Sequence, residues 1–173
     1  MELGSGSEIV AIVDEANRVT GQASRAEMRA GMLIHRACYI LVFNRRGELF
    51  VQKRTLSKDI YPGFYDVAAG GVVLAGESYE ESAGRELLEE LGISAELTVG
   101  FDHFHDSIDN RVWGRVFTCR HDGPMRLQPE EVAEGFFLAL PEVLALSRRE
   151  PFTPDGIEIL NLCLQQTPEV GKA

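Results

Sequence analysis

Short apolar segments separated by polar turns recur along the chain, and this pattern predicts a protein rich in β-strands. The segments on either side of the polar turn at 14–17 are expected to pair as a hairpin, and so are those on either side of 44–47. Pro62 and Gly63 interrupt the chain before the next strand. The expected strands are residues 9–13, 19–23, 37–43, 49–53, 65–69, 95–105, 111–120 and 134–138.

Between and after these strands, other segments predict helices. The expected helices are residues 26–32, a segment that starts near Ser78, a segment that begins with 141–146, and residues 154–165. Helices interspersed with strands favour layers of helix packed on a mixed sheet. The predicted fold class is α/β in the broad sense that includes α+β, with a three-layer α/β/α sandwich.

Length and composition set the domain organisation. The chain has 173 residues, of which 45% are hydrophobic, enough to form one domain with a substantial core. We expect a single domain over residues 1–173, with a short hairpin extension at about 7–30. No apolar run approaches the roughly 20 residues of a membrane span. The first residues also lack the pattern of a signal peptide, so we expect a cytoplasmic protein without a membrane partner.

The net charge of −10 narrows the range of ligands. Binding to duplex nucleic acid needs a basic surface for the phosphates, and we therefore expect no such partner. Small anionic substrates remain compatible with this negative net charge, because a bound cation can reverse the electrostatic field around the site. A homodimer is left open.

Three cysteines, Cys38, Cys119 and Cys163, lie far apart in apolar surroundings. Their spacing matches neither a CxxC pair nor a Cys/His metal site. We interpret them as small buried side chains in a reducing compartment, not as nucleophiles.

The most informative segment is GVVLAGESYEESAGRELLEELGI at residues 71–93. It fits the pattern G-x5-E-x7-R-E-U-x-E-E-x-G-U, with U an aliphatic residue, at every defined position. Its spacing brings Glu86, Glu89 and Glu90 together on one side of a helix. Three neighbouring carboxylates repel one another, and a hard divalent cation such as Mg²⁺ would relieve that repulsion.

The ends of this helix are marked in the sequence. Ser78 and Glu81 have the spacing of a capping box, and Gly92 stands where a left-handed helix end is expected. A second set of side chains should anchor the helix from the face opposite the carboxylates: Leu87, Leu88 and Leu91. The expected result is a loop and a leucine-anchored helix whose carboxylates face a cleft.

The segment resembles the Nudix box, the signature of hydrolases that cleave nucleoside diphosphates linked to another group X. The resemblance implies Mg²⁺, with Mn²⁺ as a possible substitute, and a small-molecule diphosphate as substrate. The metal ligands that it implies are Glu86, Glu90, Glu89, Gly70 through its carbonyl, and Glu77. The catalytic residues that it implies are Glu89, Glu86 and Arg85, and Arg85 should also pair with Glu77 and hold the loop against the helix. Which carboxylate acts as the base stays open.

Residues 9–70 also resemble the branch of this family that includes isopentenyl-diphosphate isomerase. The shared features include His35, the Lys53-Arg54 pair, Lys58 and the Pro-Gly turn at 62–63. In that enzyme a metal-binding histidine occupies the position that corresponds to His35, and basic residues at the positions of Arg54 and Lys58 contact the diphosphate. The resemblance therefore implies substrate binding by Arg54, Lys58 and His35. A structural histidine remains the alternative for His35, and solvated surface charge the alternative for the two cations.

The departures from the isomerase favour a hydrolase. Ala69 replaces the catalytic cysteine of the isomerase. Gly71 replaces one of its metal-binding histidines, and a second would fall near Met28. The acids of its later strand would fall near Asn110 and Val112. Without that acid/base pair, protonation and deprotonation of an allylic substrate have no catalyst. The box itself is complete here, as in the bacterial uncharacterised Nudix hydrolases of this branch.

Further candidates rest on weaker patterns. His103 and His105 alternate on one strand and could reach the cleft together. In Nudix enzymes the general base often comes from a loop. The acids in the predicted loops of this chain are Asp106, Asp109, Glu130 and Glu131. The aromatic side chains that could stack on a nucleobase, although each is also suited to a core, are Tyr61, Phe64 and Trp113.

Two other function classes remain open. One is a catalytically silent Nudix module that binds a nucleotide ligand as a sensor, against which the complete carboxylate set speaks. The other is an isomerase or transferase of prenyl diphosphates, against which Ala69 speaks. The identity of X is not encoded in any motif of the sequence.

Overall fold

The computed structural model describes residues 5–166, so the outermost residues of the expected 1–173 domain lie outside the described part. The strands are β1 (Ile9–Val13), β2 (Val19–Ser24), β3 (His35–Phe43), β4 (Leu49–Arg54), β5 (Tyr65–Asp66), β6 (Thr98–Asp106), β7 (Arg111–Arg120) and β8 (Val132–Leu138). The helices are the short 3-10 turn η1 (Ser5–Ser7), α1 (Arg25–Ala30), α2 (Tyr79–Leu91), α3 (Leu140–Leu146) and α4 (Pro154–Gln166).

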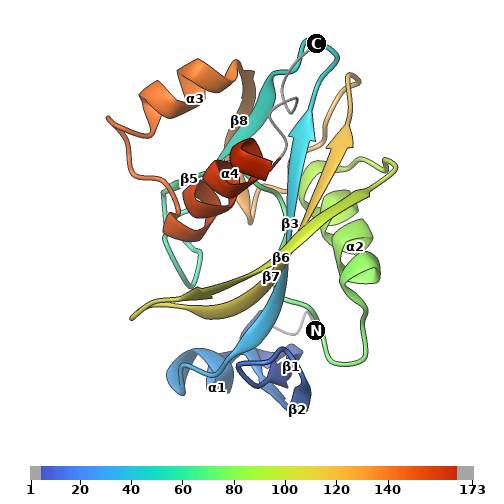
Figure 1. Ribbon diagram of the computed structural model, residues 1–173, viewed down its shortest axis with the longest axis vertical. Helices are drawn as coiled ribbons and strands as arrows, with labels where there is room; N and C mark the ends of the chain where they lie inside the picture. Colours follow the sequence, from blue (N-terminus) through green and yellow to red (C-terminus); the bar gives the residue numbers. More distant parts are fainter. Residues whose placement is uncertain (1–4, 167–173) are drawn as a thin grey trace.

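Strand β3 is the centre of a mixed sheet (Figure 1). It runs parallel to β7 along its whole length, from the pair His35–Val112 to the pair Phe43–Arg120. At its far end it forms the expected hairpin with β4, and at its near end it contacts β1. Strand β6 extends the sheet beyond β7, and β8 pairs antiparallel with β4.

Alternate side chains of β3 enter two separate cores, because successive residues of a strand point to opposite faces. Tyr39 and Leu41 belong to the core beneath α3 and α4, whereas Ile40 and Val42 belong to the core beneath α2. Figure 1 shows α3 and α4 on one side of the sheet and α2 on the other. This is the expected three-layer arrangement.

A small N-terminal unit of β1, β2 and α1 lies at the end of the molecule where β3 begins (Figure 1). Its hairpin has the predicted strands, and α1 is shorter than expected. Ser24 caps α1 in a reciprocal bond pattern with Glu27. Val10 and Met28 pack with Val72 in a third apolar cluster, which fixes the unit to the segment before α2.

The segment 69–74 runs beside β3 and carries the chain to α2. The Ile40 amide donates to the Ala69 carbonyl at 2.7 Å, and the Cys38 amide donates to the Gly71 carbonyl at 3.0 Å. A continuous strand over 65–69 was expected, but β5 contains only Tyr65 and Asp66, and Ala69 joins β3 through an isolated bridge. Positive φ angles at Gly63 and Gly70 turn the chain before and after this region.

Helix α2 has both predicted ends. Ser78 and Glu81 form the capping box, and Gly92 closes the helix with a φ of 64°. Leu87 is buried as expected, but the prediction for Leu88 is wrong, since it is 59% exposed. Glu90 is buried instead, because it lies about 60° from Leu87 around the helix whereas Leu88 lies about 100° away.

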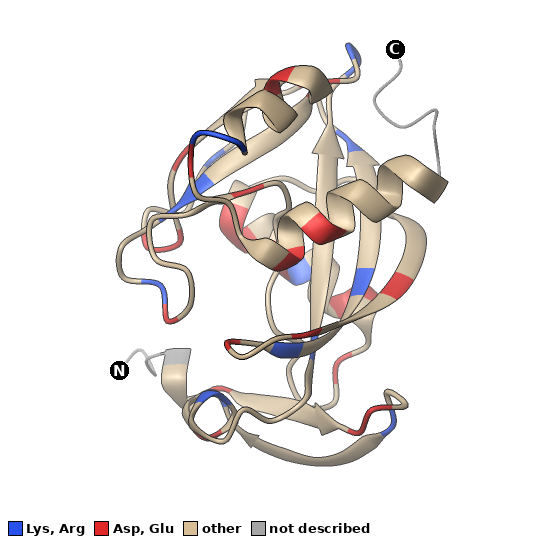
Figure 2. Cartoon of the chain, turned by 60° about the vertical axis from the view of Figure 1, so that its left-hand side comes forward, with Lys and Arg blue, Asp and Glu red and all other residues tan. Residues whose placement is uncertain are grey.

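Among the described residues, no helix is both long enough and apolar enough to cross a membrane. Acidic and basic positions are interspersed over the chain, and α4 carries acidic positions in its first two turns (Figure 2). All three cysteines are free and buried, as the sequence predicted.

The two adjacent leucines of α2 make a matched test of this packing. Leu87→Ala should lower the free energy of unfolding by about 2–5 kcal/mol, because it leaves a cavity under the helix. Leu88→Ala should change it by less than about 0.5 kcal/mol, because the side chain faces solvent. Urea titration followed by circular dichroism measures both, and equal losses would show that the helix is rotated from this position.

Candidate active site

The three carboxylates of α2 differ in their surroundings. Glu90 is buried, the Glu86 side chain is only 14% exposed, and the Glu89 side chain is 51% exposed. Glu86 and Glu90 therefore form a buried pair on the side of the helix next to the sheet. Glu89 stands at the rim of that pair.

Arg85 binds several carboxylates at once. Its Nε donates to Glu77 Oε1 at 2.7 Å, the expected pair, and its Nη1 donates to Glu86 Oε1 at 2.8 Å and to Glu89 Oε2 at 3.2 Å. Glu77 also accepts the Leu74 amide at 3.1 Å, so the loop and the helix are joined through one guanidinium. Arg85 thus fixes the positions of the carboxylates.

Two glycines let the backbone approach these carboxylates closely. The Gly70 amide donates to Glu90 Oε2 at 3.1 Å. Gly70 has a φ of 136°, and a Cβ there would lie 2.1 Å from the Cys38 carbonyl oxygen. A Cβ on Gly71 would lie 2.6 Å from Glu86 Oε1. The segment 69–74 therefore needs glycine where it passes the helix.

The buried pair favours a bound cation. Burial raises the pKa of Glu86, against the opposing effect of Arg85, and burial and the neighbouring Glu86 raise the pKa of Glu90. Carboxylate and carbonyl oxygens are the ligands that Mg²⁺ prefers, and a divalent cation would remove the repulsion between the two acids. The pair and the Gly70 backbone fit such an ion.

The third carboxylate, Glu89, is bound to Arg85 at 3.2 Å and is 51% exposed. Among residues 5–166, no group of three or more His, Cys, Asp or Glu side chains is arranged to hold a metal. A complete set of ligands would require Glu89 to exchange its bond with Arg85 for one with the ion, or water to take its place.

A cavity of about 70 Å³ opens beside the Gly70–Gly71 backbone. It brings together four residues that the sequence proposed for the site: Arg54, Lys58, His35 and Gly70. The charge of Lys58 acts on Glu90, so the cationic part of the cavity lies toward α2.

The two predicted substrate-binding cations are also held by protein groups. Arg54 Nη2 donates to the Ile60 carbonyl at 2.8 Å, and its Nη1 lies 3.8 Å from Asp66. Lys58 pairs with Glu131. These contacts fix Arg54, at the end of β4, and Lys58, in the loop that follows. Each of the two side chains retains further donors for an anion.

His35 lies at the start of β3 with 2% of its surface exposed. Its Nδ1 lies 3.1 Å from the Leu33 carbonyl. Burial, followed by the charge of Arg29, lowers its pKa to about 4. His35 is therefore neutral near pH 7 and lines the cavity as an uncharged group.

The sequence did not single out two arginines of the cavity. Arg25 and Arg29 stand on α1, and both lie within 3.1 Å of Asp59 Oδ2 through their Nε atoms. Burial would raise the pKa of Asp59, but these guanidiniums hold it far below its ordinary value. The i,i+4 spacing of the arginines was visible, but nothing in the sequence indicated that α1 reaches the loop at 55–63.

Most of the positions that differ from the isomerase face the cavity. Ala69, Gly71, Asn110 and Val112 line it, and none offers a titratable group. Met28, in contrast, is buried in the N-terminal cluster. The cavity therefore lacks an acid/base pair at these positions.

The sequence left open whether His103 and His105 reach the cleft, and neither of them lines this cavity. Both face α4, where His103 Nε2 lies 3.1 Å from Glu158 Oε1 and His105 Nδ1 lies 2.5 Å from Glu158 Oε2. A shared face of a strand could be read from the sequence, but not the helix that covers that face.

The loop acids are placed in different surroundings. Asp106 pairs with Arg111, Asp109 is exposed, and Glu130 contributes its carbonyl to Thr55. Only Glu131 reaches the cavity, indirectly, through its pair with Lys58.

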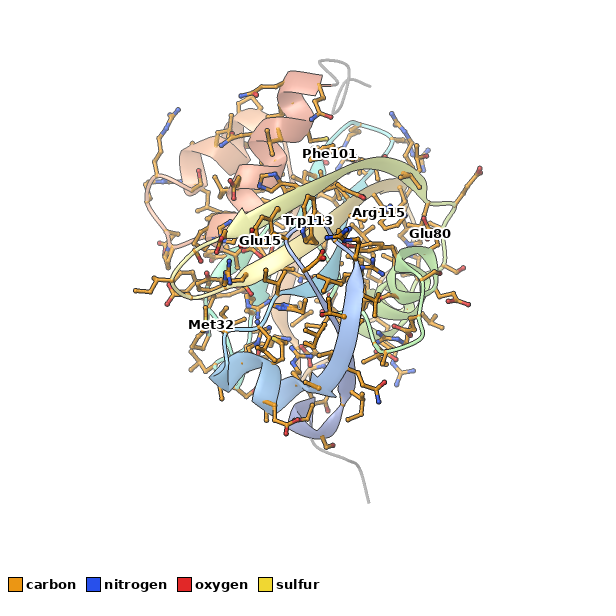
Figure 3. All side chains as sticks on the ribbon, turned by 60° about the horizontal axis from the view of Figure 1, so that its bottom comes forward. Glu15, Met32, Glu80, Phe101, Trp113 and Arg115 are labelled. Carbon is orange, nitrogen blue, oxygen red and sulfur yellow. The ribbon has the colours of Figure 1, made fainter. Side chains whose placement is uncertain are left out.

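Of the three aromatic candidates, Tyr61 alone lines the cavity, where its ring stacks on Phe64 at 5.5 Å. Trp113 stacks on Phe104 at 5.2 Å. It shares a face of β7 with Arg115 (Figure 3), opposite the face on which Val112 lines the cavity. Trp113 is therefore not placed to stack on a ligand there.

Comparisons with known proteins agree with this geometry. The family model for the NUDIX domain matches residues 33–161. The uncharacterized Nudix hydrolase PA4841 of Pseudomonas aeruginosa is 48% identical over 161 residues, covering 92% of this chain and 95% of the relative. The uncharacterized Nudix hydrolase YfcD of Escherichia coli is 45% identical over 163 residues, covering 94% of this chain and 89% of the relative.

Solved structures show the same fold. DR0079 from Deinococcus radiodurans superposes with a TM-score of 0.79 at 27% identity, covering 90% of this chain and 99% of that one. The NUDIX domain of Shewanella oneidensis NrtR, solved with ADP ribose, gives a TM-score of 0.63 at 14% identity. That match covers 76% of this chain and 87% of the NrtR domain, and at this identity it concerns the fold alone.

Two glycines, one beside the helix α2 and one within it, should respond to alanine with opposite signs. Gly70→Ala should lower the free energy of unfolding by about 1–3 kcal/mol, because the new Cβ overlaps the Cys38 carbonyl oxygen and the φ of 136° disfavours a side chain. Gly84→Ala should raise it by about 0.5–1 kcal/mol, because this exposed helix position has open space. Urea unfolding measures both changes, and a gain at both positions would contradict the close approach at Gly70.

His35 should make the stability pH-dependent. Its pKa is lower in the folded chain than the ordinary value of 6.5, so the unfolded chain binds the proton first and stability falls as the pH drops from about 6.5 toward 4. Between pH 7 and 4.5 the wild type should lose about 2 kcal/mol more than His35→Asn, whose amide can replace Nδ1. The facing charges, Arg25, Arg29 and Asp59, remain in both proteins. Urea unfolding with equal pH slopes would exclude a buried neutral histidine.

Proposed function

The chain belongs to the Nudix family and is a hydrolase of pyrophosphate linkages, and we propose that it is a single-domain, Mg²⁺-dependent enzyme that cleaves a nucleoside diphosphate linked to X or a related diphosphate. The observation that carries the metal dependence is the buried pair of Glu86 and Glu90 beside the Gly70 backbone. Their repulsion is offset in part by Arg85, by the Gly70 amide and by the charges of Arg25 and Lys58, and a divalent ion would offset it further.

We propose the following roles for the chain's residues. Glu86 and Glu90 hold the divalent ion, with the Gly70 carbonyl and Glu89 available to complete its ligands. When bound, the ion neutralises phosphate charge and lowers the pKa of a coordinated water. Mn²⁺ takes the same oxygen ligands and is expected to substitute for Mg²⁺.

Arg85 and Glu77 position the carboxylates without touching the substrate. Because Arg85 binds Glu86 and Glu89 through one nitrogen, it offsets the repulsion between the two acids until a cation replaces one of its bonds. A carboxylate released from Arg85 can then accept a proton from water. The choice of base lies among the acids of α2.

The substrate's phosphates bind in the cavity beside this pair. Arg54 and Lys58 carry the positive charge there, and Arg25 and Arg29 add to it from α1. His35 lines the cavity as an uncharged side chain. Positioned guanidinium and ammonium groups bind phosphate oxygens through charge-assisted hydrogen bonds.

The chemistry can be tested by replacing one box carboxylate at a time. Glu86→Gln and Glu90→Gln nearly preserve volume and should each lower kcat by at least roughly 10²-fold, because a charge that holds the ion is lost. Both variants should fold, since each relieves repulsion between neighbouring carboxylates. Glu80→Gln removes an exposed carboxylate of the same helix and should stay within about twofold of the wild type.

Activity is measured as release of phosphate or nucleoside monophosphate with Mg²⁺, Mn²⁺ or EDTA. The panel contains ADP-ribose, which is bound in the NrtR structure, together with nucleotide sugars, dinucleotides, coenzyme A, oxidised nucleotides and non-nucleotide diphosphates. Wild-type turnover by Glu90→Gln would refute its role as a ligand. Metal-dependent binding without turnover across the panel would favour the sensor alternative.

A further inference from the structure

The cavity has an acidic end in addition to its cationic part. Asp66 on β5 and Asp155 in the first turn of α4 both line it, and each is 8% exposed. Neither carboxylate belongs to the segment 71–93 that carries the metal-binding acids. Two buried acids in a cavity for an anionic substrate need a separate explanation.

The charge of Asp155 acts on Asp66. After burial, the charge of Asp155 is the strongest influence that raises the pKa of Asp66, to about 6. The charges that act on Glu86 and Glu90 come instead from groups such as Arg25 and Lys58. The acidic end is thus distinct from the part of the cavity beside α2.

The acidic end contains a buried carboxylate oxygen that no protein donor reaches. Asp155 Oδ2 accepts the Tyr39 hydroxyl at 2.7 Å, whereas Asp155 Oδ1 is buried and has no hydrogen-bond partner. Asp66 Oδ1 accepts the Ala68 amide at 3.1 Å, and its other oxygen lies 3.8 Å from Arg54. A buried carboxylate oxygen without a donor is costly, and a donor on a ligand would satisfy it.

The neighbours of the acidic end limit that donor. Asp66 and Asp155 line the same cavity of about 70 Å³ as Arg25 and Lys58, so the donor and the phosphates of one molecule must share this space. A hydroxyl or ammonium on a short carbon chain meets this requirement. The phosphates of the same molecule would then lie toward Arg25 and Lys58.

We propose that Asp66 and Asp155 form a subsite that binds a small hydrogen-bond donor, a hydroxyl or an ammonium group, on the X part of the diphosphate substrate. The subsite rests on the proposed function, because it assumes that the diphosphate occupies the cationic part of the cavity. It gives X a chemical class: a short polar group that carries at least one donor close to its phosphate.

Three diphosphate monoesters of equal chain length test this assignment: ethyl diphosphate, 2-hydroxyethyl diphosphate and 2-aminoethyl diphosphate. Their dissociation constants are measured by calorimetry in EDTA, and their hydrolysis is measured with Mg²⁺. The wild type should bind at least one of the donor-bearing esters about tenfold or more tightly than ethyl diphosphate. The ester with the larger gain identifies the donor as hydroxyl or ammonium.

Asp155→Asn should reduce that preference to about threefold or less, and it should do so more completely for the aminoethyl ester, because the neutral amide still accepts from a hydroxyl. Glu158→Gln is the matched control: it converts a carboxylate of the same helix that contacts His103 and His105 and does not line the cavity. It should retain the wild-type preference. Asp66→Asn replaces Asp155→Asn if the latter does not fold.

The outcomes separate the two hypotheses. Equal affinity of the wild type for the three esters would overturn the subsite, as would a preference that survives in both aspartate variants. Metal-dependent hydrolysis without any preference would leave the proposed function standing and remove the subsite. A binding preference without hydrolysis of any ester or panel compound would leave the subsite standing and remove the proposed function.

Discussion

The site depends on one constraint: two carboxylates are buried side by side, and their repulsion must be offset. Glu86 and Glu90 of α2 cannot both be charged in this position unless nearby donors or a cation compensate them. Arg85 supplies one offset and the Gly70 amide supplies another. The Gly70 amide reaches Glu90 because the segment 69–74 is bound to β3, and glycine stands where this backbone meets the acids.

The N-terminal unit is part of the same site although it precedes the matched NUDIX residues 33–161. Its helix brings Arg25 and Arg29 to Asp59, and this contact fixes the loop that carries Lys58. The cavity is therefore lined by stretches that are far apart in the chain, among them α1, the loop with Lys58 and the segment 69–74. Arg25 and Lys58 line one part of it, and Asp66 and Asp155 line another part beside Arg54, which suits a ligand with phosphates at one end and hydrogen-bond donors at the other.

Local patterns predicted local features well and long-range neighbours poorly. The capping residues Ser78 and Gly92 were placed correctly, because a helix end is determined by residues adjacent in sequence. Leu88 was assigned to the wrong face, because helical spacing gives relative angles but not the direction of the sheet. His103 and His105 do share a face, yet the partner that meets them is Glu158, more than 50 residues later.

The sequence by itself determined the family, the reaction class, the order of strands and helices, and the acids and the arginine of the box, because these depend on residue types at fixed short spacings. Only the tertiary structure decided which acids are buried and which cations meet them. It also decided that Asp66 and Asp155 lie together at one end of the cavity. Burial and electrostatic partnership depend on distances between segments remote in sequence, and those distances are set by how the sheet and its helices pack.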